Sequence, residues 1–193
     1  MDSLQGVNLR HRHLKVKHVE IKKVAIIGPE CTGKSDLSEY LAREFNTVWV
    51  EEYARRYIQD LPRPYGPDDL PIIAKGQLSL EDSMVPKANR VIFCDTDLYV
   101  IKVWSTFKYG FCDPEILEAI ASRRYDLYLL TYIDIPWISD PQREHPDQRD
   151  ELYSIYLEEM KNQPVPYLEV KGEREARRKL AKESVQKLLA DTI

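Results

Sequence analysis

This chain has few cysteines, no net positive charge and no long apolar run, and each of these features argues against a class of protein. The three cysteines are odd in number and widely spaced, which indicates neither a disulfide framework nor a Cys-x-x-Cys metal site. The formal net charge of −4 gives no electrostatic basis for binding nucleic acid. No apolar run approaches the roughly 18 residues that a membrane span needs, and the N-terminus lacks the apolar core of a secretory signal. We therefore predict a cytoplasmic protein that binds neither membrane nor nucleic acid and whose partners are small molecules.

Glycine is scarce too, yet two of the seven glycines frame the run GPECTGKS at residues 28–35. This run matches the phosphate-binding pattern G-x-x-x-x-G-K-[ST] at every fixed position. An apolar strand pattern at 24–27 precedes it and a helical pattern at 36–45 follows, which is the order that a phosphate-binding loop (P-loop) requires. Backbone N–H groups of such a loop and the N-terminus of the next helix attract phosphates. The predicted nucleotide contacts are Gly28, Glu30, Cys31, Thr32, Gly33, Lys34, Ser35 and Asp36, with Lys34 on the β- and γ-phosphates and the Ser35 hydroxyl on Mg²⁺.

Short apolar strands alternate with amphipathic helices along the rest of the chain, which predicts one α/β domain with a parallel sheet. We expect strands at 24–27, 48–51, 91–95, 125–131 and 165–170. After the second strand comes a helical stretch rich in Tyr and Arg, and further helices are expected at 68 to about 90, 99–109, 114–123, 149–160 and 173–189. The polar, proline-punctuated segment 134–148 is too rich in breakers to be regular and is predicted to be a lid. The fold class is thus an α/β P-loop NTPase with a parallel five-stranded sheet flanked by helices.

A basic segment precedes the first strand, and we assign residues 1–22 to an N-terminal extension and 23–193 to the P-loop domain. His11, His13 and His18 are interleaved with its lysines and arginines. A metal site would need better-defined spacing and a fourth ligand, so a solvated extension or an extra edge element is the simpler interpretation.

Carboxylates at the ends of the second and third predicted strands are the features that distinguish among P-loop proteins. Asp95 ends an apolar strand, as a Walker-B carboxylate does, and is predicted to hold Mg²⁺ together with Ser35. Glu52, favoured over Glu51, is placed to accept the proton of a hydroxyl that attacks the γ-phosphate. Asp97 is an alternative base or a contact for substrate hydroxyls, unless it merely caps the following helix.

Arginines and aromatic residues complete the expected site. Arg143 and Arg149 lie in or beside the predicted lid, from which guanidinium groups could close on the transferring phosphoryl group. Aromatic rings in the helices after the second and third strands suit a flat heteroaromatic acceptor, particularly a cationic one. Of these rings, Trp104 and Tyr109 are the favoured pocket residues.

The combination of motifs resembles the bacterial NadR-type nicotinamide riboside kinase domain family. The resemblance spans about 23 to 193 and rests on GPECTGKS at 28–35, FNTVWVEEYARRY at 45–57, CDTD at 94–97 and DIPWISDPQREHPDQR at 134–149. It implies a nucleoside- and nucleotide-kinase-like fold, ATP with Mg²⁺ at Gly33, Lys34 and Ser35, and metal assistance from Asp95. The acceptor contacts expected from resemblance and composition together are Glu52, Tyr53, Arg55, Asp97, Trp104 and Tyr109.

Two departures from the family pattern fall on the acceptor pocket. Glu51 stands where the family can have a tryptophan before the Glu-Tyr pair, and Lys108 stands at the place of a tyrosine, with Tyr109 beside it. Phosphate chemistry is therefore better supported than the identity of the acceptor.

We predict a kinase that uses ATP and Mg²⁺ to phosphorylate a ribonucleoside, most simply nicotinamide riboside to nicotinamide mononucleotide. The alternatives are a kinase for another nucleoside and a regulatory ATP-binding switch with slow ATPase activity. A GTPase is disfavoured, because the chain has no N-K-x-D pattern for reading guanine. The oligomeric state stays open, a homo-oligomer included.

Overall fold

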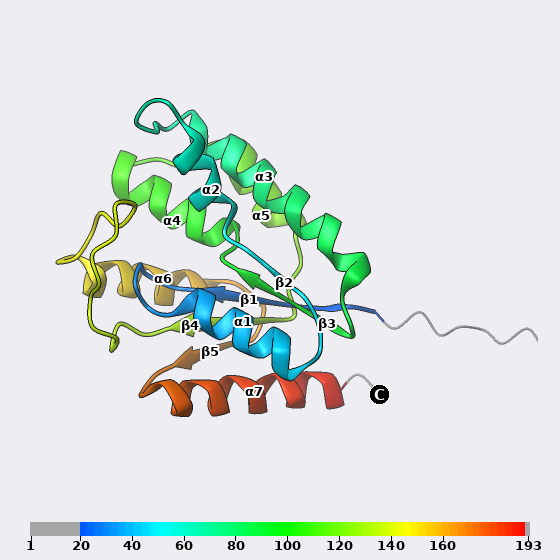
Figure 1. The fold of residues 1–193 in the computed structure, drawn as a ribbon. Coiled ribbons are helices and arrows are strands. Elements are labelled where there is room, and N and C mark those ends of the chain that lie inside the picture. The colour runs from blue at the N-terminus through cyan, green and yellow to red at the C-terminus, as the bar shows by residue number, and fades with distance from the viewer. Residues whose placement is uncertain (1–19, 192–193) are drawn as a thin grey trace, which may run out of the picture.

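A computed structural model describes residues 20–191, which form five strands and seven α-helices (Figure 1). One or two α-helices follow each strand. The strands are β1 (Lys22–Ile27), β2 (Trp49–Val50), β3 (Val91–Asp95), β4 (Leu127–Thr131) and β5 (Tyr167–Val170). The helices are α1 (Lys34–Glu44), α2 (Tyr53–Asp60), α3 (Asp69–Met84), α4 (Leu98–Tyr109), α5 (Pro114–Ser122), α6 (Arg149–Asn162) and α7 (Arg174–Ala190), and a short 3₁₀ helix, η1 (Val85–Lys87), follows α3.

The five strands form one parallel sheet in the order β2-β3-β1-β4-β5. Ile26 of the central strand pairs with Asp95 on one side and with Leu129 on the other. Because all strands run in the same direction, their carboxyl ends meet at one edge of the sheet. The connections that leave β1 and β3 run in opposite directions, so ligands are expected in the crevice between these two strand ends.

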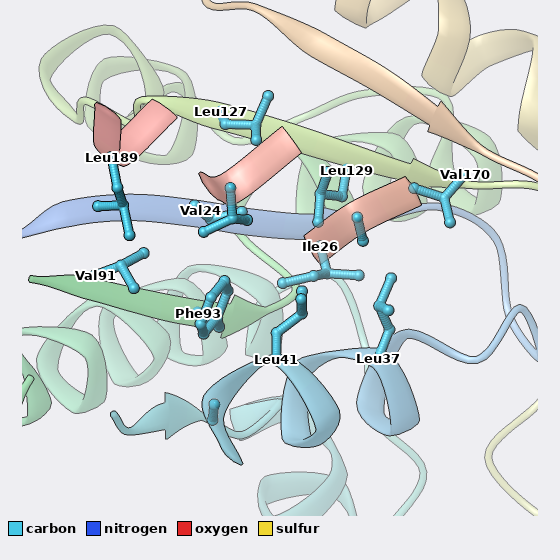
Figure 2. Close-up of a cluster of buried hydrophobic side chains, with 13 residues drawn as sticks. Val24, Ile26, Leu37, Leu41, Val91, Phe93, Leu127, Leu129, Val170 and Leu189 are labelled. Carbon is cyan, nitrogen blue, oxygen red and sulfur yellow. The ribbon is translucent and has the colours of Figure 1, made fainter. Parts of the chain in front are cut away.

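Alternate residues of the central strand supply two separate cores, as a strand buried on both faces requires. Val24 and Ile26 pack with α1 and α7, and Leu37 and Leu41 of α1 point toward the sheet in this cluster (Figure 2). Ala25 and Ile27 face the opposite side and pack with α4 and α6. The lower helices in Figure 1, α1 and α7, thus cover one face, while α4 and α6 cover the other.

A third core joins α2, α3, α4 and α5 on the outer side of α4. Gly76 of α3 makes this packing possible, because a Cβ there would lie 2.1 Å from the ring of Tyr53 in α2. The Tyr53 backbone N–H also donates to Gln77 Oε1 at 2.8 Å. Tyr53 therefore fixes the start of α2 against α3.

The parallel five-stranded sheet and its flanking helices confirm the predicted fold class. The helix expected from 68 to about 90 ends at Met84, because Pro86 cannot continue the α-helical hydrogen bonding and imposes the turn of η1 instead. The second strand is shorter than predicted, and the fourth and fifth begin two residues later. Most of the predicted N-terminal extension, with its three histidines, lies outside the described residues, whereas Lys22 belongs to β1. Within 20–191, no helix is both long and apolar enough to cross a bilayer.

Asp69, the first residue of α3, hydrogen-bonds the turn-rich segment 61–67 that precedes the helix. Its buried carboxylate accepts hydrogen bonds from the Arg63 guanidinium at 2.7 and 2.8 Å, from the Gly66 N–H at 2.7 Å and from the Tyr57 hydroxyl at 2.8 Å. The Arg63 hydrogen bonds, followed by that of Gly66, hold the pKa of Asp69 well below its usual range. This carboxylate therefore fixes the segment that carries Tyr65.

We expect Asp69→Asn to lower the free energy of unfolding by about 1–3 kcal/mol at pH 7, because it leaves buried donors with poorer acceptors. A carboxyl whose folded pKa is lowered stabilises the fold above its unfolded pKa of about 4, and that stabilisation is lost as the pH falls below it. Urea unfolding measures this effect: the difference in free energy of unfolding between Asp69→Asn and the unmodified protein should be smaller at pH 3 than at pH 7. Asp68→Asn, at the exposed neighbour, is the control, and an equal loss there would contradict the assignment.

Candidate functional site

A cavity of about 530 Å³ lies at the carboxyl edge of the sheet, a volume that suits a small-molecule ligand. The whole P-loop lines it, from Gly28 to Asp36, together with residues from α2, α4 and α6. Its remaining walls come from residues 63–65 and from residues 141–145 of the predicted lid. The lid segment runs irregularly beside α4 and α6, shown in yellow in Figure 1.

Both glycines of the P-loop have backbone conformations that favour glycine. Gly28 has a φ of +135°, and a Cβ there would lie 2.6 Å from Thr131 Oγ1 and 2.7 Å from the Thr131 carbonyl oxygen. Gly33 has a φ of +80°, and a Cβ there would lie 2.9 Å from Ile135 Cδ1. The Thr131 backbone therefore excludes any side chain at Gly28, whereas at Gly33 the positive φ is what favours glycine.

Some P-loop side chains line the cavity, whereas the Thr32 hydroxyl is hydrogen-bonded within the protein. Lys34 lines the cavity, and its ammonium group donates to the Gly28 and Pro29 carbonyl oxygens at 3.0 and 2.9 Å. Thr32 is buried, and its hydroxyl bonds the Pro29 carbonyl oxygen at 2.8 Å and Thr131 Oγ1 at 2.7 Å. Thr32 therefore has its backbone N–H, rather than its hydroxyl, to offer a phosphate. Ser35, exposed at the first turn of α1, keeps a hydroxyl beside the cavity.

Asp95 combines burial with an unused oxygen. The residue is 2% exposed, and its Oδ1 has no hydrogen-bond partner among the described residues. Burial, reinforced by the charge of Glu52, raises the pKa of Asp95 to about 6, while Lys34 and the Ser35 hydroxyl act in the opposite direction. A buried carboxylate oxygen without a donor, close to a serine hydroxyl, fits a hard cation such as Mg²⁺, which takes oxygen ligands.

The two candidate bases lie in different environments. Glu52 lines the cavity at the start of α2, with Oε2 3.4 Å from Arg55 Nε. Asp97 is 1% exposed and is not among the cavity-lining residues. Its Oδ1 accepts the N–H groups of Tyr99 at 3.0 Å and Val100 at 3.4 Å, which caps α4, and its Oδ2 accepts the Tyr128 hydroxyl at 3.1 Å. Burial raises the pKa of Asp97 to about 7. The geometry favours Glu52 as the group that can reach an acceptor.

The two arginines predicted for the lid also lie in different environments. Arg143 lines the cavity, and its guanidinium donates to the Ile138 carbonyl oxygen at 2.5 Å and to Cys31 Sγ at 3.4 Å. Arg149 is buried at the start of α6 and donates to the carbonyl oxygens of Ile133 and Ile135 at 2.7 and 2.9 Å. Arg149 thus shapes the base of the lid, whereas Arg143 faces the space where phosphates are expected.

The predicted acceptor residues are only partly brought together. Arg55 and Trp104 line the cavity, whereas Tyr53 and Tyr109 pack in the third core. Asp36 lines it too, but its carboxylate is bound by Arg174 and Arg178 of α7.

Sequence analysis missed Tyr65, whose ring lies 4.9 Å from that of Trp104 and whose hydroxyl accepts the Trp104 indole N–H at 3.1 Å. Tyr65 lies in a proline-rich turn, and no local pattern marks it as part of a pocket.

Arg177 of α7 is a second residue that sequence analysis missed. It is 5% exposed and donates to the Thr32 carbonyl oxygen of the P-loop at 2.7 Å. It also donates to the carbonyl oxygens of Gly172 at 2.9 Å and Tyr132 at 2.5 Å, and it is ion-paired with Asp134. Arg177 therefore holds the P-loop, the lid base and the turn after β5 together, and no spacing in the sequence signals this.

Comparison with known proteins gives a family and several relatives. The profile of a family described as AAA domain matches residues 23–177. The chain is 30% identical over 187 residues to the trifunctional NAD biosynthesis/regulator protein NadR of Escherichia coli (strain K12), covering 89% of this chain and 45% of that protein. For NadR of Salmonella typhimurium the identity is 30% over 165 residues, with 81% and 40% covered. The chain thus spans less than half the length of the curated relatives it matches.

Two solved structures with similar folds are a NadR protein and a deoxyadenosine kinase. The crystal structure of NadR protein in complex with NR aligns with a TM-score of 0.75 and 25% identity, covering 88% of this chain and 52% of that one. Deoxyadenosine kinase from M. mycoides aligns at a TM-score of 0.61 and 12% identity, covering 86% and 99%. The second likeness is one of fold alone.

Proposed function

We propose that this chain, a member of the AAA domain family, is an ATP-dependent ribonucleoside kinase. Its similarity to NadR and its nucleoside kinase-like fold support the proposal. The proposed reaction transfers the γ-phosphoryl group of ATP to the primary hydroxyl of nicotinamide riboside. The bond between the γ-phosphorus and the bridging oxygen breaks, a bond from the hydroxyl oxygen to phosphorus forms, and the hydroxyl proton leaves. The products are ADP and nicotinamide mononucleotide.

The observation that carries the proposal is that one cavity contains both kinds of groups that such a reaction needs. The P-loop and Lys34 line one part, and the aromatic rings of Tyr65, Trp104 and Phe107 line another. Glu52 lines the same cavity, and its charge acts on the buried Asp95. Phosphoryl transfer depends mainly on positioning and charge neutralisation, and this arrangement supports both.

Ser35 and Asp95 are the residues that would hold Mg²⁺. When bound, the cation would neutralise charge on the β- and γ-phosphates. Glu52 would orient the acceptor hydroxyl and accept its proton, and Arg143 would offer its guanidinium to the phosphoryl oxygens. Asp97 and Arg149, held by their own hydrogen bonds, would act by positioning α4 and the lid base.

Acceptor-dependent release of ADP tests this proposal directly. With ATP and Mg²⁺, nicotinamide riboside should stimulate ADP release at least about 10-fold over the acceptor-free rate and yield the mononucleotide. Uridine, cytidine and deoxyadenosine serve as competing acceptors. A rate with nicotinamide riboside no higher than the acceptor-free rate would refute that substrate, and the same result with every acceptor would refute the kinase.

A kinase for another nucleoside is the second candidate. It is favoured by the two positions at which this sequence departs from the NadR-type pattern, Glu51 and Lys108. Glu51, where the related family can have a ring, is exposed, and Lys108 contacts Tyr65 and Glu144 and is not among the cavity-lining residues. The aromatic side chains that line the cavity near Lys108 are instead Tyr65, Trp104 and Phe107. Preference for uridine or cytidine over nicotinamide riboside in the same assay would select this alternative.

A further inference from the structure

Glu30 places a negative charge inside the phosphate-binding loop, where it opposes the binding of a triphosphate. Its Oε2 accepts the backbone N–H groups of two lid residues, Glu144 at 2.9 Å and His145 at 3.2 Å. These two donors turn the carboxylate toward the lid. The P-loop therefore holds the lid through a side chain, while its backbone N–H groups remain available to phosphates.

Glu144 extends this connection to the other end of the cavity. Its carboxylate accepts from Lys108 Nζ at 2.7 and 2.8 Å and from the Tyr65 hydroxyl at 2.8 Å. Tyr65 in turn accepts from the Trp104 indole, and both rings line the cavity. One continuous path of hydrogen bonds thus runs from Glu30 through Glu144 to the aromatic wall.

Other contacts hold the lid without making this connection. Cys31 Sγ accepts the Ile138 N–H at 3.2 Å, and Arg55 pairs with Asp140 at 3.3 Å. These contacts join the lid to the P-loop and to α2. The Glu30 contacts differ because Glu144, which they hold, accepts the hydroxyl of Tyr65, a residue whose ring lines the cavity.

We propose that Glu30 is a positioning residue that couples the triphosphate site to the acceptor site by holding the lid closed between them. This inference rests on the proposed kinase function and deepens it. An acceptor stacked on Tyr65 and Trp104 favours the arrangement in which Glu144 is held, and so favours the closed lid. By reciprocity, a closed lid favours the acceptor. Closure then excludes water from the site once an acceptor is in place.

Glu30→Ala tests the coupling, and Glu30→Gln keeps an oxygen that can accept the two N–H groups. Glu39→Ala is the matched control, because Glu39 lies on α1 with a side chain 53% exposed. We expect Glu30→Ala to raise the KM for the acceptor about 5- to 20-fold and to raise acceptor-free ATP hydrolysis relative to transfer. The KM for ATP should stay within about 3-fold or fall, since a negative charge has been removed. Glu30→Gln should restore most of the acceptor affinity.

Amide hydrogen exchange gives a readout that does not depend on activity. The Glu144 and His145 amides should exchange at least about 5-fold faster in Glu30→Ala than in the unmodified protein, with no change in Glu39→Ala.

Equal exchange in the two alanine variants, or a raised KM for ATP with an unchanged KM for the acceptor, would overturn the inference. If the unmodified chain phosphorylates no acceptor, the proposed function falls, and the exchange rates still decide whether Glu30 holds the lid.

Discussion

Lys34→Ala is expected to reduce acceptor-dependent ADP release by about 10²- to 10³-fold, the effect of removing one preorganised charge from a phosphoryl-transfer site. Lys34 is the cation at the end of the P-loop, and its ammonium group lies among the carbonyl oxygens of Gly28 and Pro29. The proposed role of Lys34 is to bind the β- and γ-phosphates from this position. Turnover under saturating ATP and acceptor, together with ATP binding by calorimetry, measures the loss.

Because Lys34 also donates two hydrogen bonds to the loop, the melting temperature should be recorded alongside activity. Lys34→Met keeps the length of the side chain and should lose activity equally. Lys179→Ala removes a lysine from α7 whose side chain is 77% exposed and should leave turnover unchanged. If Lys34→Ala kept both its ATP affinity and its turnover, the assignment of this loop to phosphate binding would be refuted.

Asp95→Asn is expected to abolish Mg²⁺-dependent turnover while leaving the fold as stable as before or more stable. Burial raises the pKa of Asp95 to about 6, so at pH 7.5 the folded protein carries a charge that its surroundings disfavour. Removing that charge should contribute on the order of 1–3 kcal/mol to stability. Loss of the carboxylate should lower turnover by at least about 10²-fold, because the metal loses a protein ligand.

Urea unfolding at pH 7.5 and a titration of turnover against Mg²⁺ concentration measure the two effects. Asp82→Asn, at a side chain 61% exposed on α3, is the control for charge removal. Asp97→Ala provides the opposite case, since it removes the acceptor of three hydrogen bonds and should destabilise the protein. Full turnover in Asp95→Asn at the same Mg²⁺ requirement would show that Asp95 does not hold the metal.

The fold and the position of the P-loop at the sheet edge were predictable because their signals are local. The P-loop occupies eight consecutive residues, and the strand that ends in Asp95 pairs in parallel with β1, which places that carboxylate at the same edge of the sheet as the loop. The resemblance to NadR, stated from four short motifs, is confirmed by the comparisons. The lid was predictable from its prolines and polar residues, and the structure shows the segment without regular helix or strand.

The acceptor end was less predictable because its contacts join distant parts of the chain. Tyr65 and Glu144 are 79 residues apart, and Thr32 and Arg177 are 145 apart, so no spacing marks either pair. Asp97 shows the opposite difficulty. Its position after a strand suits both a base and a helix cap, and the structure shows a capping hydrogen-bond pattern, whereas its part in the reaction stays a prediction. Tyr53 and Tyr109 have the same ambiguity between packing and recognition, and both lie in a core.

The hydrogen bond from Arg177 to the Thr32 carbonyl oxygen joins α7 to the P-loop, so the loop can be completed only late in biosynthesis. On the ribosome the glycine turn leaves the exit tunnel long before α7 has been translated. Until that helix has emerged and docked, the turn lacks one of the donors that fix its geometry. Nascent chains should therefore gain their full affinity for nucleotide only after α7 has docked.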